Sequence, residues 1–77
     1  MEFSPAQCRA ARALIKWSQA DLQAAAKVAK KTIADFEREA RQPYPRTLAA
    51  IRAALEAAGV TFTSGDEPGL KLRKPVP

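Results

Sequence analysis

Two adjacent lysines open a short helical pattern near the middle of the chain, and they are the residues whose types and spacing best suggest a chemistry. In the stretch KVAKKTIADFE, Ile33 and Phe36 are three residues apart, the spacing of one face of a helix that begins near Lys30. Cations there cost stability, because a helix N-terminus already carries partial positive charge and Ala29 cannot cap it. The same charge becomes favourable once an anion binds. Lys30 and Lys31 are therefore candidate anion-binding residues.

The residue types that the chain lacks argue against catalysis. It has no histidine, which removes the commonest general base and metal ligand, and its one cysteine cannot form an internal disulfide. The carboxylates are scattered over polar faces, so no acid–base or nucleophilic constellation can be assembled. We expect no enzyme, no metal and no cofactor. The net charge of +5 and the isoelectric point near 9.9 favour a polyanionic partner.

The length of 77 residues predicts one small domain with a thin stability margin, which a second copy of the chain would improve. Hydrophobic residues make up 47% of the chain, but many are alanines that add little volume to a core. No segment reaches the roughly 20 apolar residues that cross a bilayer, and MEFSPAQC lacks a signal-peptide pattern. We expect a cytoplasmic protein.

Capping residues place the first helix. Ser4 is a good N-cap, Pro5 suits the first helical position, and Gln7 completes a capping box. Phe3 and Cys8 occupy the two positions of a hydrophobic staple. The expected buried line of this helix is Cys8, Ala11, Leu14 and Ile15.

A second capping box and two short breaks place the next helices. Ser18 and Asp21 repeat the capping box, with Trp17 able to staple onto Leu22, and predict a helix over residues 19 to about 27. A third helix is expected over residues 30 to about 39, with Ile33 and Phe36 inward. The second helix is expected to bury Leu22, Ala25 and Ala26.

The last part of the chain changes from helical to strand periodicity. Pro45 can open a fourth helix, with Leu48, Ile51 and Leu55 on one face, and Gly59 can end it with a positive φ. VTFT and LKLR then alternate around the turn chemistry of SGDEPG, which predicts a β-hairpin. KPVP is expected to be a tail.

Two short helices joined by a tight turn, the second basic at its start, are typical of a helix-turn-helix unit. SQADLQAAAKVAKKTIADFE, followed by RQP and TLAAIRAALEAAGV, resembles the phage-repressor-type (Xre/Cro-like) helix-turn-helix transcriptional regulators. It is most similar to short bacterial members that end in a strand, a Pro-Gly turn and a second basic strand. The resemblance spans about residues 7–74. Its markers are Ser18, Gln19, Leu22, Val28, Ile33, Glu37, Pro43, Leu48 and Gly59.

The resemblance implies a mainly α fold, a four-helix repressor-like helix-turn-helix domain followed by a C-terminal β-hairpin. Residues 1–59 would form the DNA-binding domain, residues 60–74 a hairpin for dimerisation, and residues 75–77 the tail. The chain departs from the family pattern at Gln23, which is usually Ala, and at Ala29, often Ser or Thr. Lys27 stands in the turn where the family often has Gly, so a positive φ is expected there. Glu39 stands where the family often has Gly to end the third helix.

In this family the third helix lies in the DNA major groove. The resemblance therefore implies base contacts, with lysine donating to guanine and threonine contacting the thymine methyl group. Asp35, expected on the same outer face, can accept from cytosine N4. A simple solvated face is the alternative. The residues assigned to bases are Lys30, Lys31, Thr32 and Asp35.

Contacts to phosphate are implied at the start of the second helix and around the loop after the third. Backbone N–H groups at a helix start can hold a phosphate, and the family counterpart of Gln19 does so. Ordinary surface polarity is the alternative for each of these residues, and Glu37 is interpreted as structural, pairing with an arginine. The residues assigned to phosphates are Gln19, Arg38, Arg41, Gln42 and Arg46.

The hairpin and the function each leave two interpretations open. The hairpin either covers the helices of its own chain or pairs with a second copy, with Phe62 and Leu72 near the interface. The leading function is a homodimeric regulator that binds an inverted repeat in double-stranded DNA, with no membrane or small-molecule ligand. The alternative is a protein-interaction module, an antitoxin or anti-activator that uses the same fold.

Overall fold

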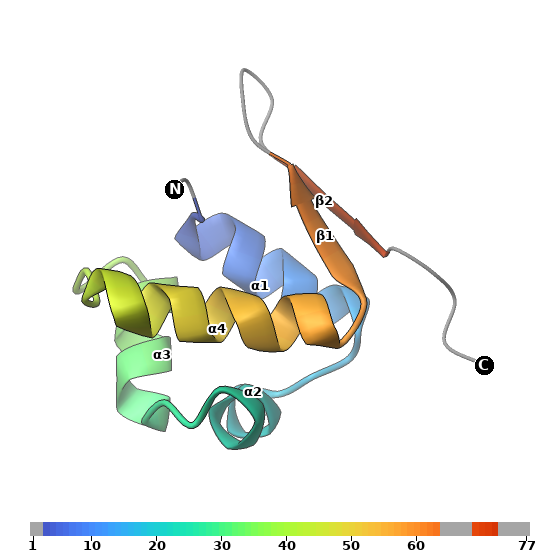
Figure 1. Ribbon diagram of the computed structural model, residues 1–77. Coiled ribbons are helices and arrows are strands. Elements are labelled where there is room, and N and C mark those ends of the chain that lie inside the picture. The colour runs from blue at the N-terminus through green and yellow to red at the C-terminus, as the bar shows by residue number, and fades with distance from the viewer. Residues whose placement is uncertain (1–2, 64–68, 73–77) are drawn as a thin grey trace.

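The computed structural model describes residues 3–63 and 69–72, and shows four helices followed by an antiparallel hairpin (Figure 1). This confirms the expected fold class. The two strands pair Val60 with Leu72 at one end and Thr63 with Gly69 at the other. None of the helices within the described ranges is long and apolar enough to cross a membrane. The elements are α1 Pro5–Leu14, α2 Gln19–Ala26, α3 Lys30–Glu37, α4 Pro45–Ala57, β1 Val60–Thr63 and β2 Gly69–Leu72.

The first two helices begin at the predicted capping boxes. The Gln7 backbone N–H donates to Ser4 Oγ over 3.1 Å, and Gln7 Oε1 accepts from the Ser4 N–H over 2.9 Å. Ser18 and Asp21 make the same reciprocal bonds at the start of α2. These pairs satisfy N–H groups that would otherwise have no partner inside the helix.

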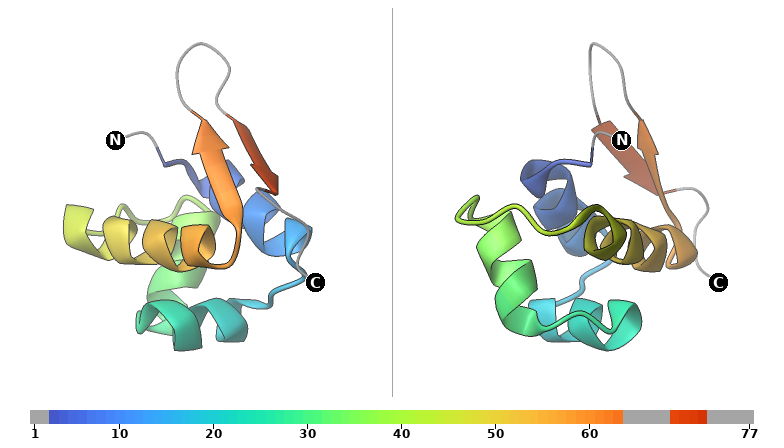
Figure 2. Two further views of the ribbon diagram at one scale, coloured as in Figure 1. Left: turned by 45° about the vertical axis from the view of Figure 1, so that its right-hand side comes forward. Right: turned by 60° about the vertical axis from the view of Figure 1, so that its left-hand side comes forward.

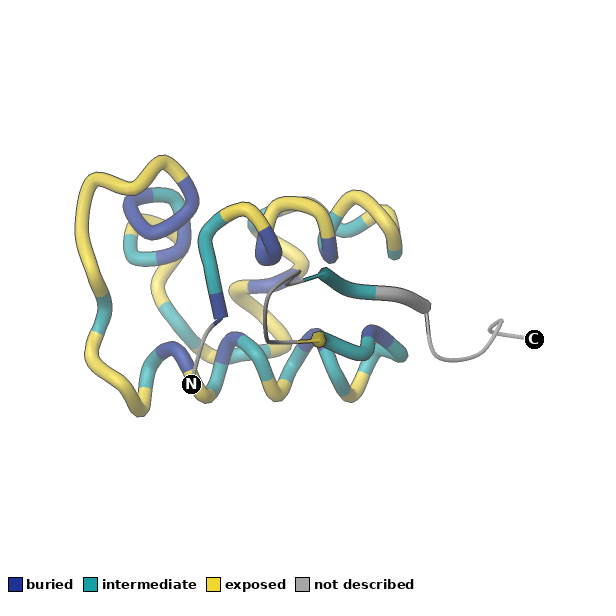
Figure 3. Tube along the Cα trace, turned by 90° about the horizontal axis from the view of Figure 1, so that it is seen from above, coloured by how far each residue is buried: buried dark blue, intermediate teal, exposed yellow. Residues whose placement is uncertain are grey.

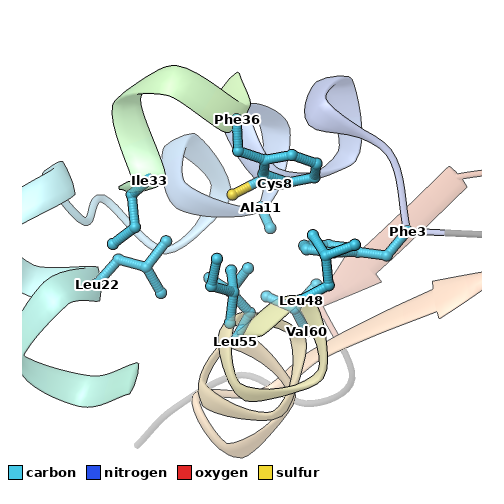
Figure 4. Close-up of a cluster of buried hydrophobic side chains, with 10 residues drawn as sticks. Phe3, Cys8, Ala11, Leu22, Ile33, Phe36, Leu48, Leu55 and Val60 are labelled. Carbon is cyan, nitrogen blue, oxygen red and sulfur yellow. The ribbon is translucent and has the colours of Figure 1, made fainter. Parts of the chain in front are cut away.

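All four helices and β1 contribute to one hydrophobic core (Figure 4). Leu22 from α2 and Ile33 from α3 point toward one another and are fully buried. Phe3 stacks against Phe36 at a centroid distance of 5.8 Å and meets Phe62 edge-on at 5.0 Å. The remaining fully buried core is Cys8, Ala11, Ile51, Leu55 and Val60, with Leu48 at its edge.

Two expected core positions are exposed. The buried face of α1 runs through Ala11 toward Ile15, and Leu14 lies at its edge with 41% of its surface exposed. The buried face of α2 runs through Leu22 and the partly buried Ala26, so Ala25 lies outside it. Short helices bury a narrow stripe, and one residue to either side of it faces solvent.

The helices end slightly earlier than the periodicity predicts, because the chain turns left-handed. Lys27 has φ 57° and ends α2 at Ala26, whereas Glu39 has φ 62° just after the end of α3. The positive angle at Lys27 confirms the expectation drawn from the family pattern for the turn. Lys16, between α1 and α2, also has φ 60°, which the sequence did not reveal. Gly59 has φ 110°, in the region that favours glycine.

The hairpin packs on α1 and α4, on the side away from α2 (Figures 1 and 2). Gln7 Nε2 fastens it by donating to the Thr63 carbonyl over 3.2 Å and the Gly69 carbonyl over 2.9 Å. The Gly69 N–H also donates to Thr63 Oγ1 over 2.8 Å. The described hairpin therefore leaves the start of α3 uncovered.

Candidate nucleic-acid interface

The start of α3 presents two lysines to solvent while its other face is anchored in the core. Ile33 is fully buried and Phe36 is 1% exposed, which fixes the rotation of the helix about its own axis. Lys30 and Lys31 are exposed, and the Lys31 side chain keeps 84% of its surface accessible. Hydrophobic packing on one side thus holds donors outward on the other.

No side chain caps this helix. Ala29 precedes α3 in an extended conformation (φ −55°, ψ 139°) and makes no capping bond, and the first turn holds no acidic residue. A helix of this kind keeps unpaired N–H groups and partial positive charge at its start. The arrangement inferred from the sequence, an uncapped cationic helix start, is present in the structure.

A groove of about 530 Å³ lies between this helix start and the loop that leads to α4. Lys27 and Arg41 supply positive charge to its walls, and Thr32 and Gln42 supply hydrogen-bonding groups. The loop is exposed over most of its length (Figure 3). Charge and donors on both walls suit a strand of phosphodiester backbone. The other lining residues are Val28, Ala29, Pro43, Tyr44 and Thr47.

A buried carboxylate joins α3 to the two helices before it. Arg12 Nε and Nη2 each donate to Glu37 over 2.7 Å, and Gln19 Nε2 donates to the same carboxylate over 3.0 Å. Cys8 Sγ adds a fourth bond of 3.0 Å. The side chain of Glu37 is only 4% exposed. The network holds α1, α2 and α3 in one arrangement, in agreement with the structural role inferred for Glu37.

The same network sets the protonation of its members. Burial raises the pKa of Glu37, but the hydrogen bonds from Arg12, Gln19 and Cys8 outweigh burial and hold that pKa below its ordinary value. Burial, reinforced by the Glu37 carboxylate, raises the pKa of the Cys8 thiol. The thiol therefore stays neutral and acts as a donor to Glu37, rather than as a nucleophile.

A second carboxylate on α3 is held by two exposed cations. Arg38 donates to Asp35 Oδ1 from Nη2 over 2.7 Å and from Nε over 3.2 Å, and Lys31 Nζ donates to Oδ2 over 3.3 Å. The hydrogen bond from Arg38 lowers the pKa of Asp35, Lys31 lowers it further, and burial opposes both. Asp35 is only 8% exposed, so it does not share the open face expected for it. Its contact with a base stays a prediction.

A protein-family model described as helix-turn-helix matches residues 9–61. The chain belongs to this helix-turn-helix family. The match covers α2, the turn and α3, confirms the Xre/Cro-like resemblance, and supports a DNA-binding regulator in general terms. No curated protein matches the sequence.

Within the helix-turn-helix, the structure brings most of the predicted contact residues to the surface around α3. Arg41, Gln42 and Arg46 are exposed along the loop and the first turn of α4. Arg38 keeps 67% of its side chain accessible despite its bonds to Asp35. Gln19 is half-buried, with its amide engaged by Glu37. None of these positions is tested by the family match, and the contacts remain predictions.

Sequence reasoning about this helix-turn-helix missed most of the residues that line the groove, among them Lys27, Tyr44 and Thr47. Tyr44 is 77% exposed and lines the same groove as Arg41 and Thr32. An aromatic residue between two prolines in a polar loop was a signal that could have found it, because such a residue has no helical face to join. Lys27 and Thr47 reach the groove only through the fold, and no local pattern marks them.

The two residues assigned to a subunit interface lie in the hairpin. Phe62 is half-buried, in contact with Phe3, and the Arg52 guanidinium stands 5.6 Å from its ring centroid. Phe62 therefore packs on its own chain, which agrees with the interpretation that the hairpin covers the helices of its own subunit. The backbone of Leu72 pairs with Val60, and its side chain lies outside the described part.

Proposed function

We propose that the chain is a sequence-specific regulator of transcription whose α3 enters the major groove of double-stranded DNA. The observation that carries this proposal is the uncapped start of α3, with Lys30 and Lys31 exposed beside a cationic groove. In this pose Lys30, Lys31 and Thr32 meet base edges, and Asp35 meets a base once its cations move. In that role the protein acts in the cytoplasm, at the bacterial nucleoid.

Phosphate contacts orient the helix in this proposal. The groove walls place Arg41 and Gln42 opposite the start of α3, so one DNA strand can pass between them. Arg38 is exposed just after α3, Arg46 is exposed in the first turn of α4, and Gln19 stands at the start of α2. Contacts to phosphate fix register and orientation, whereas contacts to base edges carry the sequence information.

The proposal includes a homodimer formed through residues 60–74, with residues 1–59 as the DNA-binding part and 75–77 as a tail. The sheet has two strands within the described residues, so each strand keeps one edge available for pairing. The hairpin lies away from α2 and leaves α3 open (Figure 2). Pairing through Leu72 and the remaining surface of Phe62 is therefore compatible with two exposed α3 helices on one inverted repeat.

Selection from genomic DNA tests the function directly. The purified protein is incubated with random genomic fragments, and the retained fragments are sequenced. We expect a short inverted repeat, with half-site centres about one helical turn apart or a multiple of it. No enriched sequence, together with a stoichiometric protein that co-purifies, would reject the regulator in favour of an antitoxin or anti-activator.

A further inference from the structure

Asp35 stands between the two exposed cations of α3, and this geometry is the basis of the inference. Lys31 lies one turn before it and Arg38 nearly one turn after it, and both donate to its carboxylate. The acid keeps 11% of its side-chain surface accessible, whereas Lys31 and Arg38 keep 84% and 67%. The carboxylate is thus fixed, and the cations that hold it are free to swing toward another acceptor.

We propose that Asp35 is a specificity-determining residue: it competes with DNA for Lys31 and Arg38, and releases Lys31 fully only where a G·C base pair lies opposite. The inference rests on the proposed function and deepens it. It assigns to one side chain both a penalty on arbitrary DNA and a preference at one position of each half-site.

The penalty on arbitrary DNA follows from charge. Lys31, Asp35 and Arg38 together carry a formal charge of +1, where the two cations alone would carry +2. Binding without sequence preference depends on how many phosphates are neutralised, so an acid that holds two of the exposed cations weakens it for every sequence. Exposed ion pairs are weak, which lets a better acceptor displace the carboxylate from Lys31.

The preference for G·C follows from hydrogen-bonding chemistry. If Lys31 moves to guanine O6 or N7, Asp35 loses one donor and needs another. The major-groove edge of a G·C pair offers the acceptors of guanine next to the N4 amino group of cytosine, which can donate to a carboxylate. At a T·A pair Asp35 would face the O4 acceptor of thymine without a compensating donor at the same place. One base pair thus satisfies both side chains.

The test compares Asp35→Asn with Glu56→Gln. Both changes raise the net charge by one unit, but Glu56 lies near the other end of α4, where it pairs with Arg52. Affinity is measured by fluorescence anisotropy for three duplexes: the selected inverted repeat, a random duplex, and repeats in which each G·C pair is replaced by A·T. Asp35→Glu serves as a second variant, since it keeps the negative charge but places the carboxylate one methylene farther from the backbone.

We expect Asp35→Asn to bind the random duplex at least about threefold more tightly, and to lose about tenfold in its preference for the repeat over the random duplex. It should also stop distinguishing G·C from A·T at one position of each half-site. Asp35→Glu should keep the weak binding to random DNA and lose that distinction. If circular dichroism shows that Asp35→Asn is unfolded, the inference is tested by the Asp35→Glu result alone.

Three results overturn the inference. An Asp35→Asn preference equal to that of the wild type, or changes no larger than those of Glu56→Gln, would show that the carboxylate has no role in selection. Retention of the G·C distinction by Asp35→Glu would do the same. A wild-type protein that binds no duplex in preference to another instead rejects the proposed function, and the inference with it.

Discussion

At the scale of single residues, two carboxylates on one short helix have separate environments. Glu37 is enclosed by donors from α1 and α2 and holds the helix in place. Asp35, two residues earlier, is held by cations that remain in water. Two residues along a helix are separated by about 200° of rotation, so Glu37 and Asp35 lie on different faces. Glu37 serves the fold, whereas Asp35 lies beside the exposed cations of the proposed contact surface.

Acid should unfold the protein partly through Glu37. Its pKa is depressed in the folded state, so its contribution to stability is complete above the unfolded pKa and is lost as the pH falls through the folded pKa. Glu37→Gln should lower the free energy of unfolding by about 3 kcal/mol at neutral pH, because Arg12 loses its counter-charge. Between pH 7 and pH 3 the melting temperature of Glu37→Gln should therefore change less with pH than that of the wild type.

Glu56→Gln is the control for that experiment, since its partner Arg52 is 28% and Glu56 itself 41% exposed. Glu56→Gln should lower the free energy of unfolding by less than about 1 kcal/mol. Its melting temperature should depend on pH as steeply as that of the wild type. Asp35 also has a depressed pKa, so some acid dependence will persist in Glu37→Gln. If the melting temperatures of the wild type and Glu37→Gln change equally with pH over the whole range, the role given to Glu37 is wrong.

Base and phosphate contacts should separate on mutation. Lys31→Ala should cost about 1–3 kcal/mol on the selected repeat and far less on a repeat changed at the contacted base. Arg41→Ala should weaken binding to every duplex by a similar factor. Lys16→Ala removes the same charge from a position outside the groove and is the control. Equal losses from Lys31→Ala and Arg41→Ala on all duplexes would show that the assigned roles are wrong.

At the scale of the elements, the helix ends carry both the caps and the strain. Residues 16, 27 and 39 have side chains and yet adopt φ near +60°, each just after a helix. Such a conformation is costly for a residue with a Cβ, and glycine adopts it freely. The short connections therefore contain sites where stability can be gained.

Lys16→Gly should stabilise the protein. Removing the Cβ relieves the left-handed strain at φ 60°, at the expense of a more flexible unfolded chain, for a net gain of about 0.5 kcal/mol. The melting temperature should rise by about 2–4 °C. Lys16→Ala loses the same charge and keeps the Cβ, so it should show no gain. A melting temperature of Lys16→Gly at or below that of Lys16→Ala would contradict the strain argument.

At the scale of the whole molecule, the helix-turn-helix and the hairpin lie on different sides of α1 and α4 (Figures 1 and 2). DNA binding and pairing between subunits can therefore occur together. A dimer that makes several phosphate contacts in each subunit also has a strong dependence on salt, because every neutralised phosphate releases a counterion.

The affinity of the proposed dimer for DNA should fall steeply with salt, with a slope of log K against log salt of about −0.9 for each phosphate contact. Arg41→Ala should reduce the size of that slope by about one for each subunit. Anisotropy titrations at about 50, 100 and 200 mM salt give the slope, and sedimentation gives the stoichiometry on the repeat. Affinity that barely changes over this range would rule out a backbone-contact surface.

Local signals determined which parts of the structure could be predicted. The capping boxes at Ser4 and Ser18 and the strand alternation after Gly59 depend on residues within a few positions of each other, and all three were found. The enclosure of Asp35 depends on the rotamers of its neighbours and on the packing of α3, which no spacing rule contains. The left-handed conformation at residue 16 was not predicted, because the residue there is a lysine and no glycine marks the position.

The groove was also beyond prediction, although its walls were partly named. Arg41 and Gln42 were assigned from the family, but Lys27 and Tyr44 come from segments that meet only when the chain folds. Sequence spacing relates residues on one element, whereas a groove between elements depends on their relative placement.

The double use of Gln7 links the two ends of the chain. Its amide closes the first helical turn through Ser4 and also bonds to both strands where they begin to separate. If the strands detach, through exchange with a second subunit or cleavage after residue 59, Gln7 loses two hydrogen-bond acceptors. Phe3 then loses its contact with Phe62. Native-state hydrogen exchange should therefore find the strands and the opening turn of α1 in one cooperative unit, protected and released together.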